Sequence, residues 1–193
     1  MIILASASLT RKAMLERVDL DFSVVSPLVD EDELKLKFKD LNVYELGLEL
    51  AKAKAVSVSS LHKDAYVIGA DQICLLGDHV FDKPGNFENA FKQLKELANK
   101  EHEQICSACI VYGGKVIWES QESAFLQMRN LTDTEIKAYI DLEKPFNACG
   151  SFMFEKHGKH LFAKVKGSED IILGLPVVEI LNEFYKLKVL KLP

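Results

Sequence analysis

Two apolar runs that meet at a pair of glycines limit the possible folds more than any other feature of this chain. The stretch QICSACIVYGGKVIWES (104–120) predicts two strands joined by Gly113–Gly114, because glycines supply the positive φ values that a tight hairpin needs. A smaller hairpin is predicted in ICLLGDHVF (73–81), with its turn at Gly77–Asp78. Antiparallel hairpins exclude a purely parallel sheet, so any sheet here is antiparallel or mixed.

Segments with helical spacing alternate along the chain with further strand-like runs. Strands are expected at Ile2–Ala5, Phe22–Ser26, Ala65–Ala70 (stopping at Asp71) and Ser123–Arg129, with a strand pair and a loop in 156–176. Helices are expected at Arg11–Val18 and Val43–Ser59, and after Asn86, the capping box Thr132–Glu135 and Pro176, with a charged connector at Val29–Phe38. No repeat or linker interrupts the pattern, so we predict one domain, residues 1–193, of the α/β class with helices packed on a mixed sheet.

The composition is that of an ordinary globular protein and argues against several classes. Of the 193 residues, 48% are hydrophobic and 27% are charged, and the formal net charge is -5. An acidic chain is a poor partner for nucleic acid or anionic membranes, and no apolar run approaches the roughly 20 residues of a membrane span. The short apolar start has no basic segment before it, as a secretory signal would, so a cytoplasmic location is expected.

Two motifs that often bind metals have simpler explanations in this chain. Cys106 and Cys109 form a C-x-x-C motif, but they lie in a predicted strand, where residues three apart point to opposite faces. Without a second such pair, buried free thiols are favoured over zinc or redox chemistry. His157 and His160 flank a predicted turn with no cysteine nearby, so exposed turn histidines are favoured over a zinc site.

The first strand leads into a group of hydroxyls and cations. Ile2–Ala5 is followed by Ser6 and Ser8, and then by Arg11 and Lys12 at the start of a helix. Cations there oppose the helix dipole, so an anion bound by the free N–H groups and the hydroxyls would explain them. On this stretch alone, however, two capping serines followed by two solvated cations are the commoner explanation.

Further segments carry charged residues where a ligand site would need them. Asp71 ends a predicted buried strand, where open α/β sheets place ligands, although residues in such positions are more often turn or cap residues. Asp30 and Glu31 follow another predicted strand and would suit a hard cation, with a solvated acidic loop as the commoner explanation. Lys83 precedes Pro84, which holds the lysine backbone extended.

Together these segments resemble the Maf family of nucleoside triphosphate pyrophosphatases over nearly the whole chain. The family opening S-x-S-x-x-R corresponds to Ser6, Ser8 and Arg11. The later family motifs are matched in the same order by Asp30-Glu31, Leu50-Ala51-Lys54-Ala55, Gly69-Ala70-Asp71, Lys83-Pro84 and Gly174-Leu175-Pro176. Each motif alone is weak, but the whole set in the right order is specific.

The resemblance implies a fold, a reaction and a set of site residues. The implied fold, Maf / inosine-triphosphatase-like, is an elongated mixed sheet with flanking helices and two lobes around a central cleft. The implied reaction is hydrolysis between the α- and β-phosphates of a nucleoside triphosphate, with a divalent metal cation, Mg²⁺ or Mn²⁺, as cofactor. Asp71 matches the proton acceptor, and Glu31 is expected to help to hold the metal. The residues expected to bind phosphates are Ser6, Ser8, Arg11, Lys12, Lys54 and Lys83.

Branches of the family accept different bases, and three positions of this chain bear on the choice. Gln72 and Glu155 resemble the branch that hydrolyses 7-methyl-GTP, whereas the dTTP/UTP branch usually has Thr and Gln at these positions. A carboxylate at Glu155 would accept hydrogen bonds from the N1–H and the amine of guanine. Thr10 departs from the pattern of the 7-methyl-GTP branch, which usually has at this position an aromatic residue that could stack on a methylated purine. We expect 7-methyl-GTP as the substrate, with a dTTP/UTP pyrophosphatase as the alternative.

Proteins of other classes fit the sequence less well. A haloacid-dehalogenase-like phosphatase would need a second Asp two residues after Asp71, where this chain has Ile73. A nucleotide-binding regulator without catalysis would not need the water-orienting acid, yet Asp71 is present. Members of the family are often dimers, so the resemblance also implies a possible homodimer.

Overall fold

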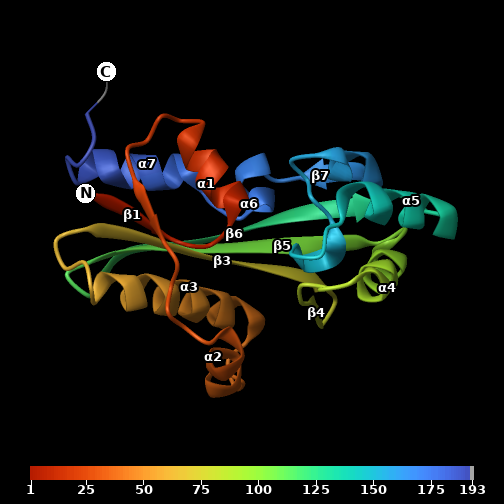
Figure 1. Ribbon diagram of the computed structural model, residues 1–193, viewed down its shortest axis with the longest axis horizontal. Coiled ribbons are helices and arrows are strands. Elements are labelled where there is room, and N and C mark those ends of the chain that lie inside the picture. The colour runs from red at the N-terminus through yellow and green to blue at the C-terminus, as the bar shows by residue number, and fades with distance from the viewer. Residues whose placement is uncertain (192–193) are drawn as a thin grey trace. The chain divides into compact units, whose positions relative to one another are not determined.

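A seven-stranded mixed β-sheet runs through the chain (Figure 1). The computed structural model describes residues 1–191. The strands are β1 (Ile2–Ala5), β2 (Ser23–Val25), β3 (Tyr66–Leu76), β4 (His79–Phe81), β5 (Glu101–Tyr112), β6 (Lys115–Met128) and β7 (Phe162–Lys166). Their order is β2-β1-β3-β5-β6-β7, with β4 paired to β3. β1 lies parallel to β2 and β3, whereas β4 and β7 pair antiparallel with β3 and β6, so the predicted mixed sheet is confirmed.

Side-chain caps begin several of the helices. In α5 the predicted capping box of Thr132 and Glu135 is present, and Asn86 caps α4 as expected. No helix in the described part of the chain is long and apolar enough to cross a membrane. The helices are α1 (Leu9–Glu16), α2 (Glu31–Lys37), α3 (Val43–Ser59), α4 (Phe87–Leu97), α5 (Asp133–Glu143), α6 (Glu169–Leu173), α7 (Val177–Lys186) and the 3₁₀ helices η1 (Cys149–Ser151) and η2 (His157–Leu161).

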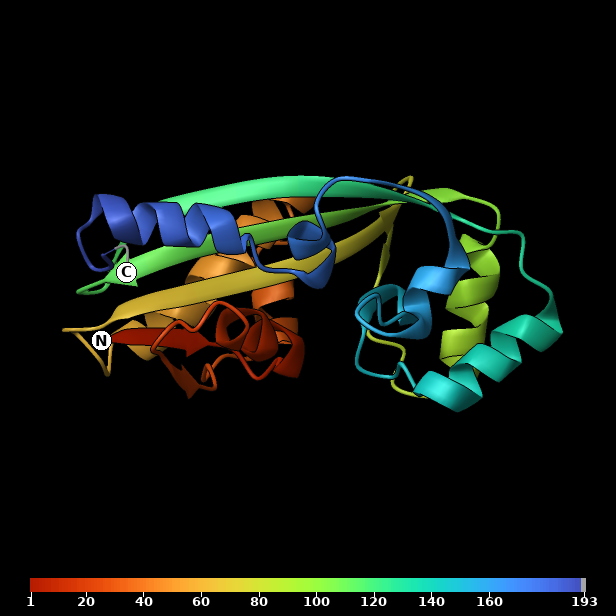
Figure 2. The ribbon, with the colours of Figure 1, turned by 90° about the horizontal axis from the view of Figure 1, so that it is seen from above.

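The chain forms two compact units. Unit 1 comprises Met1–Asp71, Cys106–Glu122 and the chain from Gly174 onward, and unit 2 comprises Gln72–Ile105 and Ser123–Leu173. In unit 1, helix α3 covers one face of the sheet and helices α1 and α7 cover the other (Figure 1 and Figure 2). In unit 2, helix α4 packs against α5 and η1.

The close approach of α3 to β3 organises the core of unit 1. Ala51 and Ala55 of α3 are fully buried against residues of β1, β3 and β5. A Cβ atom added at Gly69 of β3 would lie 2.3 Å from the carbonyl oxygen of Ala51 and 2.7 Å from the Cβ of Ala55. Only glycine therefore fits at this position, and the short distance between helix and strand places Lys54 of α3 against β3.

The charged segment predicted to be a connector is instead a helix, α2. Asp30 caps it, since its Oδ1 accepts the backbone N–H groups of Asp32 and Glu33, each at 3.0 Å. Acidic residues fill the first turn and lysines the last, which complements the helix dipole. None of its residues is buried, so the segment has no apolar stripe from which a helix could have been predicted.

The prediction that a strand stops at Asp71 is wrong. Strand β3 continues to Leu76 because Cys74–Leu76 pair with His79–Phe81 of β4 across the predicted turn at Gly77–Asp78. Asp71 is therefore an interior residue of an 11-residue strand.

Three further boundaries differ from the expected ones. Helix α1 begins at Leu9 and not at Arg11, because Ser8 is its cap. The expected separate strand Ser123–Arg129 is the C-terminal part of β6, so it continues the main hairpin. The segment 156–176 contains one strand, β7, which pairs with β6, and then the short helix α6.

The cysteines and histidines of the rejected metal motifs lie as expected. Cys106 and Cys109 are buried free thiols on β5, and burial raises the pKa of each to about 12. Thiols with such a raised pKa are poor nucleophiles and poor metal ligands at neutral pH. His157 and His160 are exposed in η2.

Candidate active site

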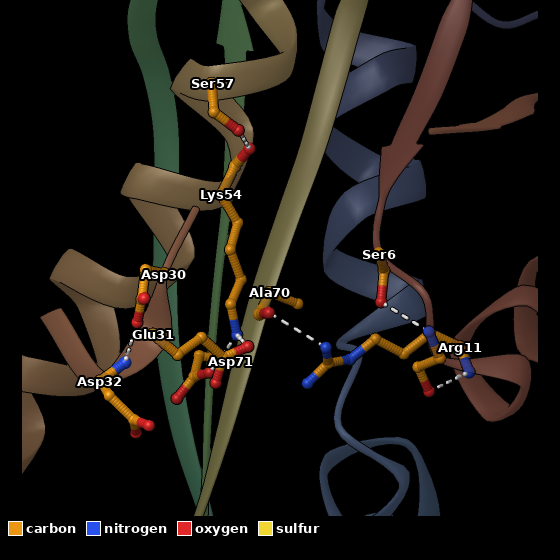
Figure 3. Close-up of polar contacts among 10 residues, drawn as sticks. Ser6, Arg11, Asp30, Glu31, Asp32, Lys54, Ser57, Ala70 and Asp71 are labelled. Carbon is orange, nitrogen blue, oxygen red and sulfur yellow. Dashed lines mark hydrogen bonds and ion pairs between the residues drawn. The ribbon is translucent and has the colours of Figure 1, made fainter. Parts of the chain in front are cut away.

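Helix α3 and strand β3 together hold a buried ion pair (Figure 3). Nζ of Lys54 lies 2.6 Å from Oδ1 of Asp71 and 3.0 Å from Oε1 of Glu31. Lys54 and Asp71 are only 6% and 7% exposed, whereas the side chain of Glu31, in the first turn of α2, is 42% exposed. Residues from three separate segments thus form one cluster, in which the ammonium lies between two carboxylates. We call it the Lys54 cluster.

Burial makes the members of the Lys54 cluster depend on one another. Removing one partner of a buried ion pair leaves an uncompensated charge and costs roughly 3–5 kcal/mol. Lys54 therefore holds the carboxylate of Asp71 in a fixed position on β3. Two carboxylates and one ammonium also leave an excess of negative charge, which favours a further cation.

The donor chemistry of the Lys54 cluster fits a hard divalent cation. Mg²⁺ is commonly bound by one or two carboxylates together with substrate phosphates, and Glu31 and Asp71 supply such oxygens. Within residues 1–191, no group of three or more His, Cys, Asp and Glu side chains could hold a metal by itself. Asp30, the other candidate donor, is engaged as the cap of α2. The residues therefore suit a metal that arrives with a polyphosphate.

Arg11 connects helix α1 to strand β3. Its Nε donates to the carbonyl of Gly174 at 2.7 Å. Its Nη1 donates to the carbonyl of Ala70 at 3.0 Å (Figure 3). Ala70 directly precedes Asp71, so the guanidinium lies beside the backbone of the candidate catalytic residue. A guanidinium has five N–H donors, and these two bonds leave others that a phosphate could accept. Phosphate binding by Arg11 stays a prediction.

The serines of the opening motif act as local caps. Oγ of Ser6 accepts the N–H of Ser8 at 3.1 Å, and Oγ of Ser8 accepts the N–H of Arg11 at 3.3 Å. In both bonds the hydroxyl is the acceptor, so each O–H group can still donate to an anion. Lys12 lies on the exposed side of α1, with its Nζ 3.4 Å from Glu16 in an ordinary surface ion pair. The capping explanation is confirmed for Ser8, whereas Ser6 only accepts the N–H of the cap residue. Phosphate binding by both serines and by Lys12 stays a prediction.

Gln72 is anchored to helix α6 within unit 2. Its Nε2 donates to the carbonyl of Ile172 at 2.5 Å and to that of Ile171 at 3.2 Å. Because consecutive residues of a strand point to opposite faces, Asp71 faces α3 and Gln72 faces α6. With its amide nitrogen engaged, Gln72 can offer a ligand only its carbonyl oxygen.

The remaining candidate residues are exposed or half-buried. Thr10 is half-buried in the first turn of α1, in unit 1. Lys83 is exposed in the loop between β4 and α4, and Glu155 is half-buried between η1 and η2, both in unit 2. Their roles in phosphate and base binding stay predictions.

Two pairs of polar residues in the structure were not predicted from the sequence. His102 and Gln104 of β5 are each only 2% exposed, and burial lowers the pKa of His102 to about 4. The one available signal was a pair of polar residues at alternate positions of an apolar strand. The pKa of Glu122 on β6 is raised by burial and by the neighbouring carboxylate of Glu179 on α7, a pairing that no local pattern indicates.

Comparison with known proteins identifies the family of this chain. A family profile described as Maf-like protein matches residues 1–187. The chain belongs to the Maf family. A protein of Legionella pneumophila (strain Corby), described as a nucleoside triphosphate pyrophosphatase, is 43% identical over 97% of this chain and 94% of its own length. A Mesorhizobium japonicum protein, described as a 7-methyl-GTP pyrophosphatase, is 38% identical over 94% of each chain.

The fold of this Maf-family chain also has a solved counterpart. The structure of the Staphylococcus aureus Ham1 protein superposes on it with a TM-score of 0.50, covering 97% of this chain and 98% of that one at 14% sequence identity. At this identity the likeness concerns the fold alone, and it agrees with the expected class of a mixed sheet with flanking helices.

Proposed function

We propose that this Maf-family protein is an enzyme that hydrolyses a nucleoside triphosphate between the α- and β-phosphates, giving a nucleoside monophosphate and pyrophosphate. The observation that carries the proposal is the Lys54 cluster, in which a buried ammonium holds Asp71 in place beside Glu31. The family membership and the activity in the names of the relatives support the same reaction.

The chemistry of the Lys54 cluster suits this reaction. Phosphoryl transfer depends mainly on positioning and on neutralising the charge of the phosphate oxygens. In this proposal, Lys54 and Arg11 neutralise part of the roughly four negative charges of the triphosphate. The carboxylate of Asp71 orients the attacking water and accepts its proton. The oxygen of that water then bonds to the attacked phosphorus as the bond from this phosphorus to the α–β bridging oxygen breaks. The bridging oxygen leaves with the other product.

A divalent metal, Mg²⁺ or Mn²⁺, forms part of the proposal. Glu31 would help to hold it together with the phosphate oxygens, because carboxylate oxygens are among the hard ligands that such ions prefer. When bound, the metal supplies further neutralisation of the phosphate charge. We also propose a homodimer, which only the family resemblance implies, and a cytoplasmic location, which only the sequence indicates.

For the base, we propose 7-methyl-guanine. The carboxylate of Glu155 would accept hydrogen bonds from the N1–H and the exocyclic amine, and the carbonyl oxygen of Gln72 is a further acceptor. The Mesorhizobium japonicum relative described as a 7-methyl-GTP pyrophosphatase supports this choice. Thr10 favours the runner-up, a dTTP/UTP pyrophosphatase, because it offers no ring on which a purine could stack.

A panel of nucleotides with product identification tests the reaction and the base together. Purified protein with Mg²⁺ is incubated with 7-methyl-GTP, GTP, ATP, CTP, UTP and dTTP, and the monophosphate and pyrophosphate are quantified. We expect pyrophosphate in every productive reaction and the highest kcat/KM with 7-methyl-GTP. Release of inorganic phosphate in place of pyrophosphate would contradict the proposed reaction. Faster hydrolysis of UTP than of 7-methyl-GTP would favour a dTTP/UTP pyrophosphatase.

The variant Glu155→Gln sharpens the test of the base. The amide keeps the shape of the side chain but presents a donor in place of one acceptor. We expect kcat/KM for 7-methyl-GTP to fall by about 100-fold, because a base donor is left unpaired, with a much smaller change for UTP. An equal change for both nucleotides would show that Glu155 does not read the base.

A further inference from the structure

Strand β5 carries two buried polar side chains whose side-chain nitrogens have no hydrogen-bond partner among the described residues. His102 and Gln104 occupy alternate positions, so they point to the same face of the sheet, and each is only 2% exposed. Both ring nitrogens of His102 and Nε2 of Gln104 lack a hydrogen-bond partner within the described residues. We call these two side chains the polar floor.

Unpartnered polar atoms of this kind need an explanation. A buried donor or acceptor loses its hydrogen bonds to water, and no residue of 1–191 compensates for this at the three nitrogens of the polar floor. Most buried polar atoms of native proteins are paired, and exceptions cluster where a ligand or an ordered water completes them. The polar floor could therefore be completed by a partner from outside the protein.

Aromatic rings lie against the polar floor and cannot complete it. The ring centroid of Phe152 lies 5.4 Å from that of His102, and the ring centroid of Phe162 lies 5.7 Å away. The rings of Phe152 and Phe162 contact each other edge to face at 4.9 Å. Phenylalanine offers no hydrogen bonds, but a flat ring with polar edges could stand in the same place and supply them.

The polar floor lies on the face of the sheet that carries Gln72. Cys74 points to the same face as Gln72, because the two are at alternate positions of β3. The side chain of Gln104 lies beside Cys74 and influences the pKa of its thiol. Gly150 of η1 packs directly on this group, since an added Cβ would lie 2.7 Å from the Cys74 sulfur.

The segment over the polar floor has an unusual backbone. Gly150 and Ser151, which precede Phe152, have φ values of 76° and 62°, in the left-handed region that favours glycine. Ser151 is fully buried and donates its hydroxyl hydrogen to Oε1 of Gln93 at 2.5 Å. The same segment continues to Glu155, the candidate base selector. We call residues 149–155 the cover segment.

We propose that the polar floor is a base subsite of unit 2. When a nucleotide binds, the cover segment shifts and the ring of Phe152 leaves His102. The nucleobase takes its place and accepts hydrogen bonds from the amide of Gln104 and from the imidazole N–H of His102. This inference rests on the proposed function, to which it adds the residues that read the base.

The chemistry of the subsite selects a planar base with mixed edges. A neutral imidazole offers one donor and one acceptor, and Nε2 of Gln104 offers donors. A guanine presents its O6 carbonyl as an acceptor for these donors, while its N1–H and exocyclic amine remain for Glu155. Phe162 remains beside the floor and would meet a ring in the place of Phe152 edge to face, which supplies the aromatic contact that Thr10 cannot.

The variants Gln104→Leu and His102→Phe test the subsite, with Gln127→Leu as the matched control. Gln127 is a half-buried glutamine of β6 in the same unit. Among the described residues, its Nε2 is seen to donate only to the carbonyl of Met128. For each variant, KM and kcat are measured with the best nucleotide of the panel, and the melting temperature is recorded. Leucine and phenylalanine remove the unpartnered atoms but keep the volume filled.

A base subsite and a merely buried pair of polar groups give different results. We expect Gln104→Leu and His102→Phe to raise KM about tenfold with a smaller change in kcat, while the melting temperature holds or rises. Unchanged KM in both variants, or an equal rise in Gln127→Leu, would overturn the subsite. Failure of the wild-type protein to release pyrophosphate from any nucleotide would instead overturn the proposed function itself.

Discussion

Lys54 is the residue through which the candidate site is held together. Its ammonium is buried, and it contacts both Asp71 and Glu31. A lysine in this position stabilises two carboxylates that would otherwise repel each other. On the other side of β3, Arg11 donates to the carbonyl of Ala70, the residue before Asp71 (Figure 3).

Replacing Asp71 by Asn tests its role directly. The amide has nearly the same shape, and Glu31 still pairs with Lys54, so we expect a folded protein that is destabilised by about 1–3 kcal/mol. Because the proton acceptor is lost, kcat should fall by roughly 100- to 10,000-fold. The exposed Asp64, changed to Asn, is the control and should keep full activity. Near-normal turnover of Asp71→Asn in a pyrophosphate assay would exclude the catalytic role.

At the scale of elements, the contact between α3 and β3 decides where the site forms. Small residues on both sides, Ala51, Ala55 and Gly69, let the helix approach the strand closely. That approach brings the ammonium of Lys54 within hydrogen-bond distance of the carboxylate of Asp71. The helix α2 then adds Glu31 from its first turn, where a carboxylate is favoured by the helix dipole.

Gly69→Ala should disturb the site through this contact. The added Cβ would overlap the Ala51 carbonyl and the Ala55 side chain, so α3 must move away from β3. We expect a loss of roughly 1–3 kcal/mol in the free energy of unfolding and a clear fall in kcat.

The control for this prediction is Gly77→Ala, in the turn between β3 and β4. An alanine there meets no atom within 4 Å but must adopt a φ of 60°. It should cost only about 0.5–1 kcal/mol and leave kcat unchanged. Denaturant unfolding and turnover distinguish the two, and equal effects of both variants would mean that the α3–β3 contact does not position the site.

At the scale of the whole molecule, stability should depend on pH through a single buried histidine. Burial lowers the pKa of His102 to about 4 from its usual 6.5. Between these values the unfolded chain binds a proton that the folded protein does not, so stability falls as the pH drops from about 6.5 towards 4. Above the usual pKa of 6.5 the histidine is neutral in both the folded and the unfolded chain, so the folded protein keeps its full stability there.

The variant His102→Phe isolates this effect from other titrating groups. From the two pKa values, the wild-type protein should lose about 2 kcal/mol more than the variant between pH 7 and pH 5. The measurement is the free energy of unfolding in denaturant at both pH values. Parallel losses in the two proteins would mean that His102 is accessible to protons in the folded state.

The features that the sequence alone determined are those that depend on neighbours in the chain. The hairpin at Gly113–Gly114 and the capping box of Thr132 and Glu135 were predicted, because a tight turn or a helix start is decided by residues within a few positions. The charged helix α2 was missed even so, since it buries no residue and has no apolar period.

Only the tertiary structure decided how the candidate site is assembled. The motif residues could be named in order along the chain, but the ion pair of Lys54 with Asp71 and Glu31 joins three segments that no local rule connects. The bond from Arg11 to the carbonyl of Gly174 spans 163 positions. The side-chain nitrogens of the polar floor that lack a partner within residues 1–191 can be recognised only once strand β5 is known to be buried. Contacts between distant segments depend on how helices and strands pack, and packing follows from the shape and volume of the whole core.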